Sequence, residues 1–186
     1  MKLPILFAAL AAVSSAALAA SPEPLPPAWI ITGQSPAKFT AGVEQEPGIR
    51  GAKFLRNKSD DPKAWAALAQ MISAQNYVGQ RIRFRAFVKT QDVSGWAGLW
   101  MRVDNRAGRS IAFYNSADKP IKGSTDWQER SVVLDVPPDG VAIVFGVNNI
   151  GTGQVWIDRL GFETVGQDVP VDVMPLSRPL PTVPVL

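Results

Sequence analysis

One segment of the chain carries the residue types best suited to binding a ligand. In the run G-W-A-G-L-W-M-R-V-D, Trp96, Trp100, Arg102 and Asp104 fall on the same side of a period-two pattern. An indole ring is a flat apolar platform for stacking, while arginine supplies hydrogen-bond donors and aspartate supplies acceptors. Asn148, at the edge of a predicted loop, adds an amide. These five residues are the candidate ligand-binding set.

Each member of this set also has a structural interpretation. Tryptophan is highly buried on average, so Trp100 could pack beneath a second layer while Arg102 and Asp104 pair with each other. Asparagine in a loop commonly stabilises the turn itself, which is the alternative for Asn148. Both interpretations remain open from the sequence.

A basic stripe, formed by Arg81, Arg83, Arg85 and Lys89, is the sharpest charge feature. These residues lie on the polar side of the run R-I-R-F-R-A-F-V-K, opposite an apolar side. The stripe could meet an anionic glycan, lipopolysaccharide or a membrane headgroup. The alternative is a solvated strand face that also resists edge-to-edge pairing.

The composition excludes most familiar enzyme chemistry. The chain of 186 residues has no Cys and no His, and thiol nucleophiles, imidazole bases, disulfides and common zinc sites need those residues. Carboxylate pairs remain, such as Asp60 with Asp61, but these sit beside Pro62 in a turn-like segment where exposed aspartate is ordinary. We therefore expect no catalytic residues and no enzyme activity. A carboxylate-dependent hydrolase is the weaker alternative.

Calcium is the metal that the residue types leave open. It takes roughly six to eight oxygen ligands, some of them backbone carbonyls that a sequence does not show. The best donors for a structural Ca²⁺ are Glu44, Glu46, Asp158 and Glu163. No other cofactor is expected.

The N-terminal region is expected to direct export. Residues 1–20 resemble a signal peptide, with Lys2 ahead of an apolar stretch and A-L-A near the end. An uncleaved anchor helix is the alternative. We expect a periplasmic or secreted protein with no stable membrane span after cleavage. In that setting the run Asn57-Lys58-Ser59 matches an N-glycosylation acceptor pattern.

Proline marks the limits of the foldable part. Residues 21–27 are a proline-rich linker, and 166–186 are a proline-rich tail expected to be disordered. The module is then 28–165. Loss of Lys2 with the signal lowers the net charge from +3 to +2, which is too small for a nucleic-acid partner.

In the middle of the chain, apolar and polar residues alternate with a period of two, which predicts β-strands separated by turns rich in Gly, Pro and Asn. This pattern indicates an all-β fold, an antiparallel β-sandwich of jelly-roll type. A break in alternation is expected near Asp158, and D-P-K-A-W at 61–65 leaves open a short helix near 62–66. The expected strands are 29–32, 39–43, 52–55, 67–72, 81–89, 95–104, 111–114, 126–136, 141–149 and 154–164.

Several runs resemble a bacterial jelly-roll domain that is similar to galactose-binding-like folds and carbohydrate-binding modules. They are Q-M-I-S-A with Y-V-G-Q-R-I-R, then G-L-W-M-R-V-D, then G-S-T-D-W-Q, and finally G-T-G-Q-V-W-I-D. This domain is often found behind the helix-turn-helix domain of proteins labelled transcriptional regulators, and sometimes exported by itself. The resemblance covers residues 36–165. Because residues 1–27 are interpreted as signal and linker, no DNA-binding domain is expected ahead of it.

The resemblance implies sugar binding on one sheet face or at a loop rim. The platform would be Trp100 or Trp96, with Arg102, Asp104 and Asn148 as polar contacts. The partner would be a glycan or another cell-envelope component. A periplasmic structural or protein-interaction module without a sugar ligand is the alternative. In related modules the last strand tends to contain I-D-D, which helps to bind calcium, whereas Arg159 stands at the second Asp position here.

Overall fold

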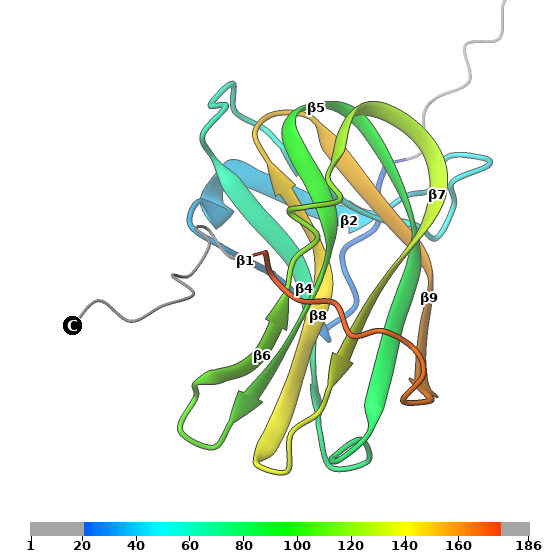
Figure 1. Cartoon of the computed structure of the whole chain (residues 1–186). Coiled ribbons are helices and arrows are strands. Elements are labelled where there is room, and N and C mark those ends of the chain that lie inside the picture. The colour runs from blue at the N-terminus through cyan, green and yellow to red at the C-terminus, as the bar shows by residue number, and fades with distance from the viewer. Residues whose placement is uncertain (1–20, 176–186) are drawn as a thin grey trace, which may run out of the picture.

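Nine β-strands and one short 3-10 helix make up the fold in residues 21–175, the part of the chain that the structure, a computed structural model, describes (Figure 1). In chain order they are β1 (Trp29–Thr32), η1 (Pro36–Lys38), β2 (Phe39–Val43), β3 (Lys53–Asn57), β4 (Trp65–Ser73), β5 (Arg81–Asn105), β6 (Ser110–Tyr114), β7 (Ile121–Asp135), β8 (Gly140–Ile150) and β9 (Gln154–Val165).

The strands form two layers in which every pair is antiparallel. The first layer has the order β1-β4-β8-β5-β6. The second layer has the order β2-β3-β9-β5-β7. Side chains alternate along each strand, so one face of each layer is buried against the other. The predicted all-β antiparallel sandwich is confirmed.

Strand β5 belongs to both layers. The sequence predicted two strands, 81–89 and 95–104, whereas the structure has one continuous strand of 25 residues. It bends over at one end of the molecule and passes from the second layer to the first (Figure 1). Register shifts against β7 and a positive φ of 54° at Asp92 accommodate the bend. The residues between the two predicted strands, 90–94, therefore form a series of bulges within one strand and not a loop.

Apolar side chains from both layers fill the space between them. Leu68, Leu99 and Val147 of the first layer are fully buried, as are Phe84 and Ile157 of the second. Each such side chain contributes about 1.5–3 kcal/mol when it leaves water. Because the chain has no Cys, this apolar core stabilises the sandwich without disulfides.

The prediction of a short helix near 62–66 is wrong. Residues 62–63 form a turn, and β4 begins at Trp65. Ala66 and Leu68 point into the core, while β1 and β8 pair with the two sides of β4. Two hydrogen-bond ladders and a buried face outweigh the helix propensity of the alanines.

The break in alternation near Asp158 is confirmed. Arg159 has a φ of 48°, and the register between β5 and β9 shifts between Arg85 and Phe87. The extra residue turns the Arg159 guanidinium over the Phe87 ring, 5.2 Å from its centroid. This is a bulge that redirects one side chain.

Both segments beside the predicted module contact the sandwich. Glu23 and Val43 exchange two backbone hydrogen bonds of 2.9 and 2.8 Å. At the other end the backbone N–H of Asp172 donates to the carbonyl of Val133 at 2.9 Å, and the Asp172 carboxylate accepts from the Val133 N–H. The predicted linker at 21–27 and the described part of the predicted tail, 166–175, are thus each held to the sandwich at these contacts, because edge strands β2 and β7 offer unpaired backbone groups. The expected signal and the rest of the tail lie outside the described residues.

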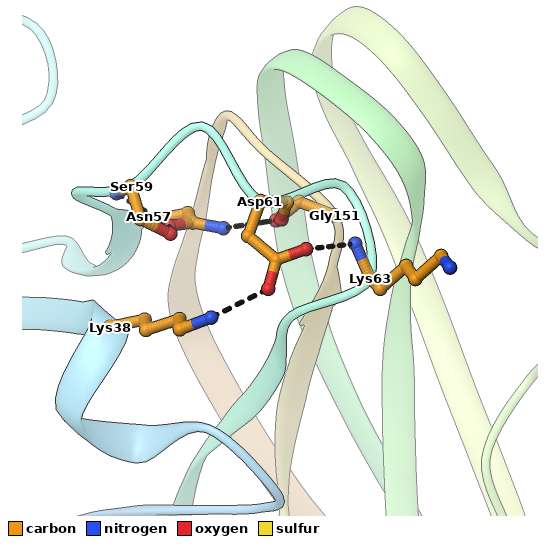
Figure 2. Close-up of polar contacts among 6 residues, drawn as sticks. All are labelled: Lys38, Asn57, Ser59, Asp61, Lys63 and Gly151. Atoms are coloured by element: carbon orange, nitrogen blue, oxygen red, sulfur yellow. Dashed lines mark hydrogen bonds and ion pairs between the residues drawn. The ribbon is translucent and has the colours of Figure 1, made fainter.

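A buried asparagine ties the loop after β3 to the turn before β9. Asn57 donates from Nδ2 to the carbonyl of Gly151 at 2.7 Å (Figure 2). Its Oδ1 accepts from the backbone N–H and the hydroxyl of Ser59 at 2.8 and 2.7 Å. Because Asn57 is only 9% exposed and its amide is engaged, the folded protein does not offer this acceptor pattern for glycosylation.

Asp61 is held in the same network. Its carboxylate accepts from Lys38 Nζ at 2.6 Å and from the backbone N–H of Lys63 at 2.9 Å (Figure 2). These contacts hold the pKa of Asp61 below its usual value. The carboxylate is thus a turn-stabilising anion.

Candidate functional site

The outer face of the first layer is unusually apolar. In the second half of β5, Leu99 and Met101 point into the core, so Trp100 and Arg102 point outward. The neighbouring positions on this outer face are small, with Gly146 of β8 opposite Trp100. Ala69 of β4 is the next residue across. The Trp100 indole packs over these small residues, and a depression remains beside it, between Trp100 and the larger outward side chains around it.

This depression is a groove of about 430 Å³. It brings together four of the five predicted binding residues, from β5 and β8, with residues from β1, β4 and β6. Asp104 does not line it. The lining residues are Thr32, Gly33, Trp65, Ala67, Trp96, Trp100, Arg102, Phe113, Asn115, Asn148 and Ile150.

Trp100 lies in the floor of the groove. It packs with Ala67, Ala69 and Val144 in a small cluster outside the main core and is 7% exposed. Trp100 is thus buried, as its structural interpretation proposed, but on the outer face of the sandwich against Ala67, Ala69 and Val144. So little exposed ring makes Trp100 a poor platform for stacking.

Trp65 and Trp96 supply the exposed aromatic surface instead. Both pair with Ile150 of β8, one from each side, which places their Cα atoms two strand spacings apart, or about 9–10 Å. Trp65 is 38% exposed and Trp96 is half-buried. Trp65 was missed from the sequence because its neighbours suggested a helix. Phe113 of β6, which is also exposed, adds a third ring.

Arg102 is the one ionised side chain among the described residues that line the groove. Its Nε lies 2.8 Å from Oδ1 of Asp104 and donates to Oδ2 at 3.1 Å. Phe113 and Val144 flank it on the adjacent strands. Asp104 is buried and contacts the groove only through Arg102, so it acts as a positioning residue.

The basic stripe lies on the second layer, outside the groove. Each of its side chains has an acidic partner on a neighbouring strand: Arg81 with Asp135 (2.7 Å), Arg83 with Glu163 (3.1 Å), Arg85 with Glu129 (3.4 Å) and Lys89 with Asp126 (3.5 Å). Arg81 also donates to the carbonyls of Gln167 and Val169 and holds the pKa of Asp135 below its usual value. The stripe is thus a charge-balanced face.

The four predicted calcium donors do not converge. Glu44 is 4% exposed, and its Oε1 accepts from Nε1 of Trp156 at 3.2 Å and Nε2 of Gln154 at 3.3 Å. Glu46 is in an exposed loop, Asp158 lies at the β9 bulge, and Glu163 pairs with Arg83. Within residues 21–175, no three acidic side chains are grouped to hold a metal ion. Nor does any helix there have the length and apolarity to cross a membrane.

Comparison with known sequences gives one informative relative. No family model matches the chain. The uncharacterized HTH-type transcriptional regulator YbfP of Bacillus subtilis (strain 168) is 38% identical over 145 residues, which are 76% of this chain and 49% of that protein. The chain thus spans about half the length of the curated relative it matches. The described residues contain no helix-turn-helix, since η1 is their only helix.

Comparison with solved structures identifies the fold. The CBM22-1 xylan-binding domain from Paenibacillus barcinonensis superposes with a TM-score of 0.54 at 12% identity, over 77% of this chain and 89% of that domain. The two share an antiparallel β-sandwich fold. The CBM22-1–GH10 modules of a Clostridium thermocellum endo-1,4-beta-D-xylanase, complexed with xylohexaose, give 0.52 at 15% identity over 75% and 26% of the two chains. A domain of bacteriophage CBA120 tailspike protein 4 gives 0.53 at 16% identity over 75% and 20%.

Proposed function

We propose that this protein is a non-catalytic carbohydrate-binding module and that it binds a glycan in the groove of the first layer. The observation that carries the proposal is a pair of tryptophans, the exposed Trp65 and the half-buried Trp96, on either side of Ile150 in the groove. The C–H faces of a sugar ring are apolar, and an indole ring offers them a flat partner. The solved structures of similar fold include xylan-binding domains, which supports this choice of ligand class.

The chemistry of the groove supports binding without catalysis. Glycosidases commonly use two carboxyl groups, about 5–10 Å apart, that flank the scissile bond. Among the described residues, none of those lining the groove is an aspartate or glutamate. Export to the periplasm or medium, where envelope glycans occur, is part of the proposal and rests on the signal-like residues 1–20.

Affinity electrophoresis through gels containing soluble polysaccharides tests the proposal. The panel includes neutral polymers (xylan, mixed-linkage glucan, galactomannan) and acidic ones (polygalacturonate, alginate). We expect at least one polymer to retard the protein, and we expect Trp65→Ala and Trp96→Ala to weaken that binding by about tenfold or more. Trp127→Ala is the matched control, because Trp127 packs beside Trp156 on the second layer.

The control should bind like the wild type once circular dichroism has confirmed that it folds. A wild-type protein that no polymer retards would refute the proposal and favour the protein-interaction module. Equal loss in all three tryptophan variants would place the binding surface elsewhere.

A further inference from the structure

The polar atoms that the groove offers to a ligand are mainly hydrogen-bond donors. Asn115 and Asn148 both line the groove, but the carbonyl oxygen of Asn115 already accepts one hydrogen bond and that of Asn148 is buried. Oδ1 of Asn115 accepts from the backbone N–H of Ala117 at 3.1 Å. Oδ1 of Asn148 is buried and has no hydrogen-bond partner among the described residues. The Asn148 amide therefore has only its NH₂ group to offer to a ligand, whereas the Asn115 amide has its NH₂ group and one remaining lone pair on Oδ1.

Arg102 adds the strongest donors. Its contact with Asp104 uses Nε, so the two terminal NH₂ groups of the guanidinium have no partner among the described side chains. In contrast, Arg81 of the basic stripe uses Nε and both terminal nitrogens in contacts to Asp135 and to two carbonyls. The open end of a guanidinium matches a carboxylate, which it can bind through two parallel hydrogen bonds.

Side-chain acceptors are scarce among the described residues of the same lining. Asp104 is turned toward Arg102 and does not line the groove, and the tryptophans can only donate. Among the described lining residues, Thr32 supplies the one hydroxyl. A sugar hydroxyl both donates and accepts and is best matched by mixed partners, whereas an ionised carboxylate only accepts. The donor-rich groove is complementary to a carboxylate.

From this imbalance, we infer that the groove recognises an acidic glycan, in which Trp65 and Trp96 contact the sugar rings and Arg102 binds the carboxylate of a uronic acid residue. The inference rests on the proposed function and names its ligand class. The NH₂ groups of Asn115 and Asn148 would contact the same carboxylate or the adjacent ring oxygens. Anion recognition is thereby assigned to the groove instead of the basic stripe.

Matched ligands provide the first test. Isothermal titration calorimetry measures the affinity of wild-type protein for three ligands. They are polygalacturonate or alginate, the same polymer after reduction of its carboxyl groups to alcohols, and neutral xylan. We expect the acidic polymer to bind, and carboxyl reduction to lower the affinity by about tenfold or more. Raising the ionic strength should also weaken binding to the acidic polymer.

Matched variants provide the second test. Arg102→Gln should lower affinity for the acidic polymer by about tenfold or more, and Arg102→Lys should recover only part of it, because an ammonium group keeps the charge but lacks the planar pair of donors. Arg83→Gln is the control, since Arg83 is an ion-paired member of the basic stripe. The reduced-polymer comparison uses wild-type protein, so it remains decisive if Arg102→Gln fails to fold.

The outcomes separate the two proposals. Binding of neutral polymers that is equal to or tighter than binding of acidic ones, or an affinity unchanged by carboxyl reduction, would overturn the inference and leave the glycan-binding function standing. Loss of acidic-polymer binding in Arg83→Gln but not in Arg102→Gln would also overturn it, in favour of the stripe. Absence of binding to every polymer would overturn both.

Discussion

Two buried asparagines provide a stringent test of the hydrogen-bond assignments. Asn57 and Asn148 are 9% and 6% exposed, so the same substitution to leucine changes little surface at either site. Asn57 is fully engaged: it donates to the carbonyl of Gly151 and accepts two bonds from Ser59. Oδ1 of Asn148 has no partner within residues 21–175. Asn57→Leu should therefore destabilise the fold strongly, and Asn148→Leu should not.

The expected change in stability follows from counting the polar groups that each substitution leaves without a hydrogen-bond partner. Asn57→Leu removes three hydrogen bonds of 2.7–2.8 Å, and it leaves the buried Gly151 carbonyl without its side-chain partner. Each hydrogen bond contributes about 0.5–1.5 kcal/mol, and a stranded buried group costs about 1–3 kcal/mol. The total loss is about 2.5–7.5 kcal/mol, or a melting temperature lower by roughly 5–30 °C for a domain of this size. Asn148→Leu removes a buried carbonyl without a partner, which should raise stability by up to about 1 kcal/mol.

Thermal unfolding followed by circular dichroism, together with urea titrations of the wild type and both variants, measures these differences. Comparable destabilisation by both changes would refute the reasoning, because it would mean that the Asn148 carbonyl has a partner in the folded protein. The inference about the groove adds a further expectation: Asn148→Leu should bind glycan more weakly than the wild type while being at least as stable. Binding residues often carry such a stability cost.

Three further predictions concern charge and metal. The hydrogen bond from Arg81 is the main cause of the lowered pKa of Asp135. The pair therefore stabilises the fold at pH values above the ordinary pKa of 3.8, and this stabilisation is lost as the pH falls through the lower pKa of the folded state. Asp135→Asn should melt at a lower temperature than the wild type near about pH 7, and at the same temperature near about pH 2. Burial, followed by a bond to Asp118, raises the pKa of Tyr114 above 10.0, so urea stability should decline above that pH in the wild type and not in Tyr114→Phe; parallel declines would contradict this. Finally, Ca²⁺ and EDTA should leave the melting temperature unchanged, whereas an increase with Ca²⁺ that Glu44→Gln abolishes would reveal a site completed by backbone oxygens.

The strand pattern, and the residues that share the outer face of the first layer, could be predicted because side-chain direction alternates strictly along a strand. Once Leu99 and Met101 are assigned to the core, Trp100 and Arg102 must point outward. The predicted set therefore came together, apart from Asp104, which reaches the groove through its arginine. The length of β5 was not predictable in the same way, since Asp92 adopts a positive φ inside a bulge that resembles a turn in the sequence.

The roles within the set depended on neighbours that a sequence does not pair. Trp100 is buried because Gly146 and Ala69 lie beside it on β8 and β4, which leaves room for the indole ring to settle onto the sheet. Trp65 becomes an exposed platform because the register of β4 and β8 places it across Ile150 from Trp96. The charge of the basic stripe is likewise decided by registers, which align its members with acidic residues of β7 and β9.

The layer order gives different parts of the groove different local stability. Trp100 and Asn148 stand on β5 and β8, which have hydrogen-bonded neighbours on both sides, so the amides of these strands should exchange with solvent only when much of the sandwich opens. Thr32 and Phe113 stand on β1 and β6, short strands that are each paired along one side. Such edges fray at a small fraction of the global unfolding energy. In the proposed glycan complex, the rim can therefore adjust to sugar chains of different width while the floor of the groove keeps its position.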